Sequence, residues 1–239
     1  MVALTVLCAY SVFGITGFGA AMVAVPVLAH LLPLSTVVPL ILLTDLLATT
    51  FVGLRQWRLV QRSELVRLML PMLVGVVLGV QALSELPSSI LLLLLGLFIV
   101  GHSVWSLWIA QASHKAISPS WAYMAGTVGG VFGAAFGTGG PIYTVYLIRR
   151  IPEVEALRAT VAATVLISAL VRLVVFGVSG LLLEQQLHLL ALGLIPFCLL
   201  GLVIGSKLRH QLPPQRLRRI MLQLLLVGGL SVIYRSQVV

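Results

Sequence analysis

The stretch GGVFGAAFGTGGPIYTVY, residues 129–146, is apolar enough to lie in a membrane, yet glycine fills six of its eighteen positions. Four of these glycines fall from Gly133 to Gly140, and Pro141 follows directly. Inside a helix, glycine costs about 1 kcal/mol relative to alanine and proline about 3 kcal/mol. The stretch therefore predicts a broken helix, with a tight turn at the glycines and a new helix whose first residue is Pro141.

A weaker pattern of the same kind, GITGFGAAMVAVP, occupies residues 14–26. It places two glycines around Phe18 and then returns to an uninterrupted apolar run. We expect a second short helix to begin near Ala20. Backbone groups freed at such breaks cannot face lipid, so both breaks should be buried in protein or line a cavity.

The composition identifies the class of protein that contains these breaks. Of 239 residues, 60% are hydrophobic and 9% are charged, with a mean hydropathy of +1.14. A soluble domain needs more polar surface, so the chain is predicted to be an all-α polytopic membrane protein. Its net charge of +9 comes mostly from short loops beside apolar spans, which indicates membrane orientation and argues against nucleic-acid binding. The candidate apolar spans are 2–29, 37–54, 68–83, 90–110, 121–148, 159–183, 187–206 and 217–234.

Features of the first half recur in the same order in the second half, which predicts an internal duplication. The matched pairs are 17–19 with 137–139, Gly75 and Gly79 with Gly201 and Gly205, and 86–87 with 212–213. We expect a first membrane repeat over residues 1–110, a cytoplasmic linker over 111–120 and a second repeat over 121–239. The glycine pairs at 75/79 and 201/205 are expected to be helix-packing positions, because small residues let membrane helices approach closely.

Loop charge predicts that the two repeats are inverted. The loop 55–67 has four arginines, whereas its counterpart 177–190 has none. Two loops should be cytoplasmic because they are basic: 111–120, which contains Lys115, and 149–158, which contains three arginines. Only the segment 121–148 separates these two loops, so it must begin and end on the same side of the membrane. Its 28 residues are too few for two spans of about 20 each, so the segment should be a re-entrant hairpin. Each repeat would then be a glycine-broken re-entrant hairpin plus three transmembrane helices; the alternative is eight plain spans.

Two hairpins that enter from opposite faces should meet near the membrane midplane. The helices leaving them would point their N-termini, each with roughly +0.5 charge, at the space between, which favours a small anion. This arrangement predicts a secondary transporter with a central anion site. The candidate substrate-binding residues are Thr16, Gly17, Phe18, Gly19, Gly137, Thr138, Gly139, Gly140 and Arg172.

Two charged residues lie inside the apolar spans. Asp45 would cost on the order of 2.5–3.5 kcal/mol to insert, so it should face protein or water. An apolar site favours the protonated carboxyl, so Asp45 is either a proton-coupling group or a hydrogen-bonded helix contact near Thr44 or Thr49. Arg172 either reaches the interface or binds substrate, since its guanidinium fork suits sulfonate oxygens. An ion pair between Asp45 and Arg172 is the third alternative.

The segments TGFGAAMVAVPVL, RQWRLVQRSELVRLMLPMLVGVVLG and FGTGGPIYTVYL resemble the TauE/SafE family of sulfite exporters and anion permeases. The resemblance extends over nearly the whole chain. It implies transport of small sulfur-containing anions, such as sulfite, sulfonates or sulfoacetate, through the bacterial inner membrane. The family tends to have a basic residue ahead of an aromatic residue and a glycine, which Arg172, Phe176 and Gly177 resemble.

Other classes of function remain as alternatives at this point. A passive anion channel would have the same composition, and flux kinetics would distinguish it from a carrier. An intramembrane enzyme is disfavoured, because the sequence has neither HExxH nor Gly-x-Ser-x-Gly. No cofactor and no metal site are expected, since the histidines are scattered. The expected partners are the anion, the lipid bilayer and coupled protons, and a homodimer is one arrangement that the sequence allows.

Overall fold

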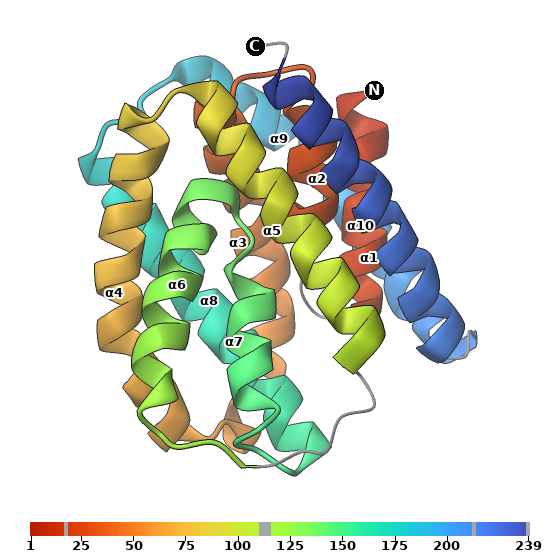
Figure 1. The fold of residues 1–239 in the computed structure, drawn as a ribbon. Coiled ribbons are helices and arrows are strands. Elements are labelled where there is room, and N and C mark those ends of the chain that lie inside the picture. Colours follow the sequence, from red (N-terminus) through yellow and green to blue (C-terminus); the bar gives the residue numbers. More distant parts are fainter. Residues whose placement is uncertain (17–18, 110–115, 212–213, 238–239) are drawn as a thin grey trace.

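The computed structural model describes residues 1–16, 19–109, 116–211 and 214–237, and within them it contains helices and no strand (Figure 1). The helices of the first half are α1 (Val2–Thr16), α2 (Ala20–Leu28), α3 (Leu34–Gly53), the 3-10 helix η1 (Leu54–Leu59), α4 (Arg62–Glu85) and α5 (Ser88–Ile109). Those of the second half are α6 (Trp121–Phe136), α7 (Gly139–Leu147), α8 (Val154–Val178), α9 (Gln185–Gln211) and α10 (Pro214–Ser236). Apart from η1, each half thus contributes two shorter helices followed by three longer ones.

Length and hydropathy mark the chain as a membrane protein. Among the described residues, four helical stretches are long and apolar enough to cross a bilayer: Arg62–Glu85, Ser88–Ser106, Val154–Val178 and Gln185–Leu208. Shorter apolar stretches lie at Val2–Ile15, Leu34–Thr50 and Leu225–Ser236. Large apolar side chains such as Leu70, Val174 and Leu192 are mostly exposed on the outer faces of these helices. An outward apolar surface is what contact with lipid requires.

The two halves are packed into each other. Helix α1 of the first half packs on α9 of the second, α6 of the second half packs on α4 of the first, and the pairs α3–α8 and α5–α10 also cross between halves. At two contacts the backbones approach closely. A Cβ on Gly75 would lie 2.1 Å from the Thr127 carbonyl oxygen, and a Cβ on Gly205 would lie 2.0 Å from the Ser11 carbonyl oxygen. The predicted packing role of these glycines is confirmed.

The segment 121–148 is a hairpin. Helices α6 and α7 both have their outer ends at one end of the bundle, where the guanidinium of Arg150 (Nη1), just after α7, donates to the carbonyl oxygen of Ile117, just before α6, at 3.0 Å. Figure 1 shows the turn between the two helices well inside the bundle, and α1 and α2 entering from the opposite end. The alternative of eight plain spans is therefore wrong, because this segment leaves where it enters.

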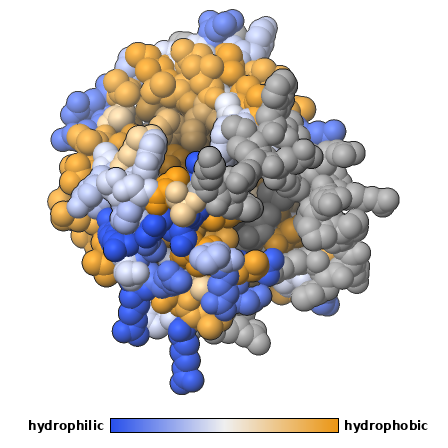
Figure 2. Space-filling view, turned by 60° about the horizontal axis from the view of Figure 1, so that its bottom comes forward, coloured by the Kyte–Doolittle hydropathy of each residue, from blue (hydrophilic) through white to orange (hydrophobic). Residues whose placement is uncertain are grey.

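Basic residues gather at the end of the bundle where α6 begins and α7 ends. We call this the basic end, defined by Arg58, Arg62, Arg67, Arg149, Arg150 and Arg158. Its loops are tied together, since the backbone N–H of Gln61 donates to Thr160 Oγ1 at 3.0 Å. Figure 2 turns this end toward the viewer and shows hydrophilic side chains projecting from a largely hydrophobic surround. Arg58 and Arg149 thus lie at the same end of the bundle, whereas Lys115 lies outside the described residues.

Candidate functional site

The first break separates α1 from α2. Gly19 has φ +94°, a left-handed conformation that L side chains rarely adopt, and α2 begins at Ala20 as predicted. Gly17 and Phe18 lie outside the described residues, and Thr16 is the last residue of α1. Glycine is thus required at the one described position of this turn, where the chain reverses.

The second break is an αL C-cap at the end of α6. Gly137 has φ +73°, its N–H donates to the Gly133 carbonyl at 2.9 Å, and the Thr138 N–H donates to the Phe132 carbonyl at 3.1 Å. Helix α7 then begins at Gly139, so Pro141 occupies its third position and the prediction that it is the first was wrong. The physical reason is that the first four N–H groups of a helix have no partner within it, so proline is tolerated anywhere in this turn.

The two breaks meet inside the bundle. A Cβ built on Gly137 would lie 2.7 Å from the Cβ of Ala21, in the first turn of α2. The short helices α2 and α7, of nine residues each, begin at these breaks. Both therefore direct their N-terminal N–H groups toward the region where the breaks meet. Two positive helix ends face the same small volume.

A small cavity of about 20 Å³ lies where the breaks meet. A cavity needs roughly 10–15 Å³ to hold one water, so this one has room for little more than that. Its walls come from both breaks and from α1, α3 and α8: Phe13, Gly19, Ala21, Asp45, Gly137, Gly139, Gly140, Pro141, Tyr143, Val165, Ser168 and Arg172. Four of the predicted site glycines and both intramembrane charges thus share one cavity.

Thr138 is placed differently from the other predicted binding residues. It is buried, and its hydroxyl donates to the Phe132 carbonyl at a long 3.4 Å. It is not among the residues that line the cavity. On the α7 side, the cavity is lined by Gly139, Gly140, Pro141 and Tyr143, and the Thr138 hydroxyl does not face it.

Arg172 brings a full positive charge to the cavity. The side chain is 3% exposed, so it does not reach the interface from its helix, and that alternative is wrong. Its Nη1 donates to the Gly133 carbonyl at 2.9 Å and its Nε to the Ser168 carbonyl at 3.3 Å. These bonds hold the guanidinium against the last turn of α6, beside the break.

Asp45 lies across the same cavity and is 6% exposed. Its Oδ1 accepts a hydrogen bond from the Tyr10 hydroxyl at 2.7 Å, and that hydroxyl is also 2.8 Å from Thr44 Oγ1. Among the described residues the ion pairs are Arg67–Glu64, Arg150–Glu64 and Arg158–Glu155. Asp45 and Arg172 are therefore not paired with each other in this conformation.

Sequence reasoning missed the aromatic hydroxyls that surround the charges. Tyr10 comes from α1, and Tyr143 comes from α7, where its hydroxyl lies 3.4 Å from Ser168 Oγ. The Tyr143 ring packs against Gly129, where a Cβ would lie 2.3 Å from a ring carbon. The glycine at 129 is therefore explained by a tyrosine fourteen residues later, which only the hairpin brings beside it.

A second network that the sequence did not reveal joins the basic end. Glu64, at the start of α4, accepts hydrogen bonds from Arg150, at 2.8 and 3.2 Å, from Arg67 at 2.6 Å and from the Tyr146 hydroxyl. The bonds to Glu64 raise the pKa of the Arg150 guanidinium, so Arg150 stays charged. The network fixes the outer end of the α6–α7 hairpin to α4.

Broken helices that bring their N-termini to a buried charged cavity in a helical membrane bundle are typical of membrane transporters. The chain belongs to the sulfite exporter TauE/SafE family, whose model matches residues 2–232. It is 31% identical over 193 residues, 80% of each chain, to the probable inner membrane transporter protein TsaS of Comamonas testosteroni. No solved structure matches. The chain is accordingly a multi-pass inner membrane transporter and not an enzyme.

Proposed function

We propose that this protein is a secondary transporter of small sulfur-containing anions, of the sulfite, sulfonate and sulfoacetate class. The observation that carries the proposal is the convergence of two helix N-termini and a buried arginine on one cavity. Each helix end supplies partial positive charge and N–H donors, and Arg172 supplies a guanidinium fork that suits the oxygens of a sulfonate. The family to which the chain belongs supports sulfur anions as the substrate class.

The proposed architecture is a pair of inverted repeats, residues 1–110 and 121–239, joined by a cytoplasmic linker over 111–120. The reciprocal packing supports it: α1 lies on α9 as α6 lies on α4, so each hairpin is held by the other half. The glycine contacts follow the same rule, since Gly201 approaches the Leu7 carbonyl oxygen in the way that its counterpart Gly75 approaches the Thr127 carbonyl oxygen. The basic end would face the cytoplasm, because positively charged loops are retained there.

The proposed transport cycle requires the breaks to separate. A cavity of about 20 Å³ is too small for a sulfonate, so substrate binds only after the contact between Ala21 and Gly137 opens. Hairpins that enter from opposite ends allow this opening to occur toward one side at a time. In the proposed site, Gly19, Gly137, Gly139 and Gly140 give backbone access to the anion, together with residues 16–18 of the first break.

Asp45 is proposed as the group that couples transport to protons. It lies in the same cavity as Arg172 without being paired to it, so a proton bound there would change the charge that faces the substrate. Protonation would remove a negative charge that otherwise opposes an incoming anion. The hydrogen bond from Tyr10 holds the carboxyl in place in either state.

The test is flux in proteoliposomes that contain the purified protein. Sulfite, thiosulfate, sulfoacetate, taurine and chloride are compared, each with and without a pH gradient. The proposal expects saturable uptake of at least one sulfur anion, stimulated by the gradient. Equal, unsaturable flux of chloride and the sulfur anions would instead identify a passive channel, and the absence of sulfur-anion flux would refute the substrate class.

A further inference from the structure

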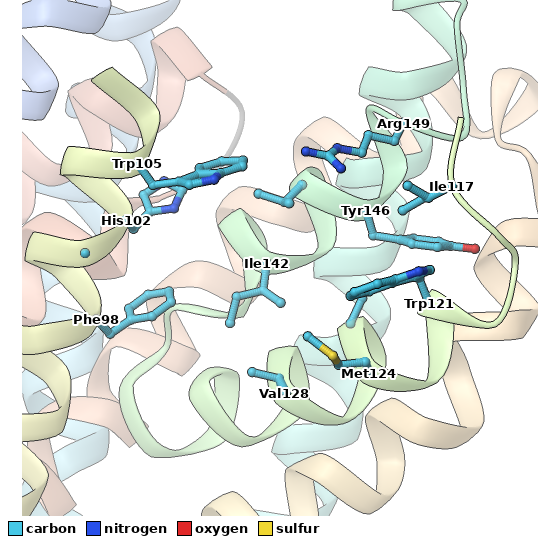
Figure 3. A pocket seen from close by; sticks show the side chains of 13 residues that line it. Phe98, His102, Trp105, Ile117, Trp121, Met124, Val128, Ile142, Tyr146 and Arg149 are labelled. Carbon is cyan, nitrogen blue, oxygen red and sulfur yellow. The ribbon is translucent and has the colours of Figure 1, made fainter. Parts of the chain in front are cut away.

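A larger cavity of about 510 Å³ lies between α5 and the α6–α7 hairpin (Figure 3). It shares no lining residue with the central cavity. Its wall is mostly apolar and includes Phe98, His102 and Trp105 from α5, Met124 and Val128 from α6, and Ile142 from α7.

The cavity opens onto the lipid-facing surface of α6. Met124 and Val128 line it and are nevertheless 57% and 38% exposed. Trp121, in the first turn of α6, also lines it and is 50% exposed. Exposed apolar side chains on a membrane helix contact lipid, so an acyl chain can enter this cavity sideways from the bilayer without passing through water.

Among the described residues that line the cavity, Arg149 is the one with a permanent positive charge. Arg149 follows α7 directly, and Figure 3 shows its side chain extending toward the cavity. No hydrogen bond or ion pair joins its guanidinium to the part of the chain that the structure describes, whereas its neighbour Arg150 is fully engaged with Glu64 and Ile117. Arg149 is therefore available to an anionic ligand at this position.

The cavity also lies at the depth of a membrane interface. It is bounded by Trp105 and Trp121, and tryptophan is enriched where the acyl chains meet the headgroups. It reaches the basic end, because Arg149 lines it. Basic pockets between membrane helices on the cytoplasmic side are suited to anionic lipid headgroups.

The geometry points to a binding site for an anionic phospholipid from the leaflet at the basic end. Its phosphate is held by Arg149 through charge-assisted hydrogen bonds, and one acyl chain fills the apolar cavity against α5 and α6. A soluble amphipathic anion has the same chemistry, but the lateral opening favours the membrane as its source. The site does not depend on which anion the protein transports.

The test uses the full-length protein, purified and depleted of lipid, with phosphatidylglycerol and phosphatidylcholine as probes. Binding is read by native mass spectrometry and by the shift in thermal unfolding. Arg149→Gln removes the charge, and Gly101→Trp fills the cavity from a position where a Cβ meets nothing within 4 Å. The matched controls are Arg158→Gln, an exposed arginine at the same end, and Gly193→Trp, an exposed glycine of α9 that is equally free of neighbours.

The expected result is that phosphatidylglycerol binds in preference to phosphatidylcholine. Arg149→Gln should weaken phosphatidylglycerol binding at least about fivefold, and Gly101→Trp should reduce it for both lipids, while both controls bind as the unchanged protein does. Unaltered phosphatidylglycerol binding in Arg149→Gln overturns the inference, even if Gly101→Trp fails to fold. Octyl phosphate below its micellar concentration is the third probe: if it binds through Arg149 and phosphatidylglycerol does not, the ligand is a soluble anion and the lipid assignment is wrong.

Discussion

Replacing Arg172 by methionine tests the central site most directly. The substitution keeps most of the apolar stem and deletes the guanidinium that lines the cavity between the two breaks. If Arg172 binds the transported anion, the variant should fold and should bind that anion more weakly. The loss is expected in substrate affinity, because the charge is in contact with substrate when the cavity is open.

The magnitude follows from the burial of the group. Arg172 is 3% exposed, so its charge is little screened by water, and a hydrogen bond to a charged group contributes about 1.5–3 kcal/mol. At about 1.4 kcal/mol for each factor of ten, affinity should fall by roughly ten- to 150-fold. The structural cost should be smaller, because the Gly133 carbonyl that loses Nη1 still accepts the Gly137 N–H at 2.9 Å.

The assay is substrate binding by titration calorimetry, with saturable flux in proteoliposomes as a second measurement. Arg158→Met is the matched control, because this arginine lies on the same helix with its side chain 53% exposed. Arg172→Lys keeps the charge without the planar fork and should lie between the methionine variant and the unchanged protein. A methionine variant with normal thermal unfolding and unchanged affinity would refute the reasoning, and Arg172 would then be a structural residue that fastens α8 to α6.

Further predictions concern coupling, the second break and orientation. Asp45→Asn keeps an acceptor for the Tyr10 hydroxyl but cannot carry the coupled proton. It should abolish the stimulation of flux by a pH gradient, while substrate affinity stays close to normal. Full gradient-driven flux in this variant would show that another group couples transport to protons. Gly137→Ala should lower the unfolding temperature and abolish flux, since a left-handed conformation costs roughly 1–2 kcal/mol and its Cβ would clash with α2. Gly177→Ala, where a Cβ meets nothing within 4 Å, is its control and should be tolerated. In intact cells, a cysteine in place of Arg149 should resist an impermeant thiol reagent and one in place of Glu85 should react; the reverse pattern would overturn the proposed orientation.

The sequence was sufficient for features that depend on local chemistry. Hydropathy predicted a helical membrane protein, because apolar composition is a property of each segment by itself. Glycines predicted both breaks, since a left-handed turn such as that at Gly137 is a local backbone requirement. Arginines in the loops indicated that 121–148 turns back, because loop charge determines the side of the membrane without reference to packing.

Only the tertiary structure decided which side chains meet. Three contacts depend on how each helix is rotated about its axis. Ala21 touches Gly137, and the Tyr143 ring packs against Gly129. The Asp45 carboxyl accepts a hydrogen bond from Tyr10 and is not paired with Arg172. The same holds for Glu64, whose partners Tyr146 and Arg150 are more than eighty residues away in the chain. The glycine and hydropathy patterns show where a membrane helix begins, ends and breaks. Helix rotation, in contrast, is fixed by the close packing of several helices at once, and no single segment of the sequence contains that information.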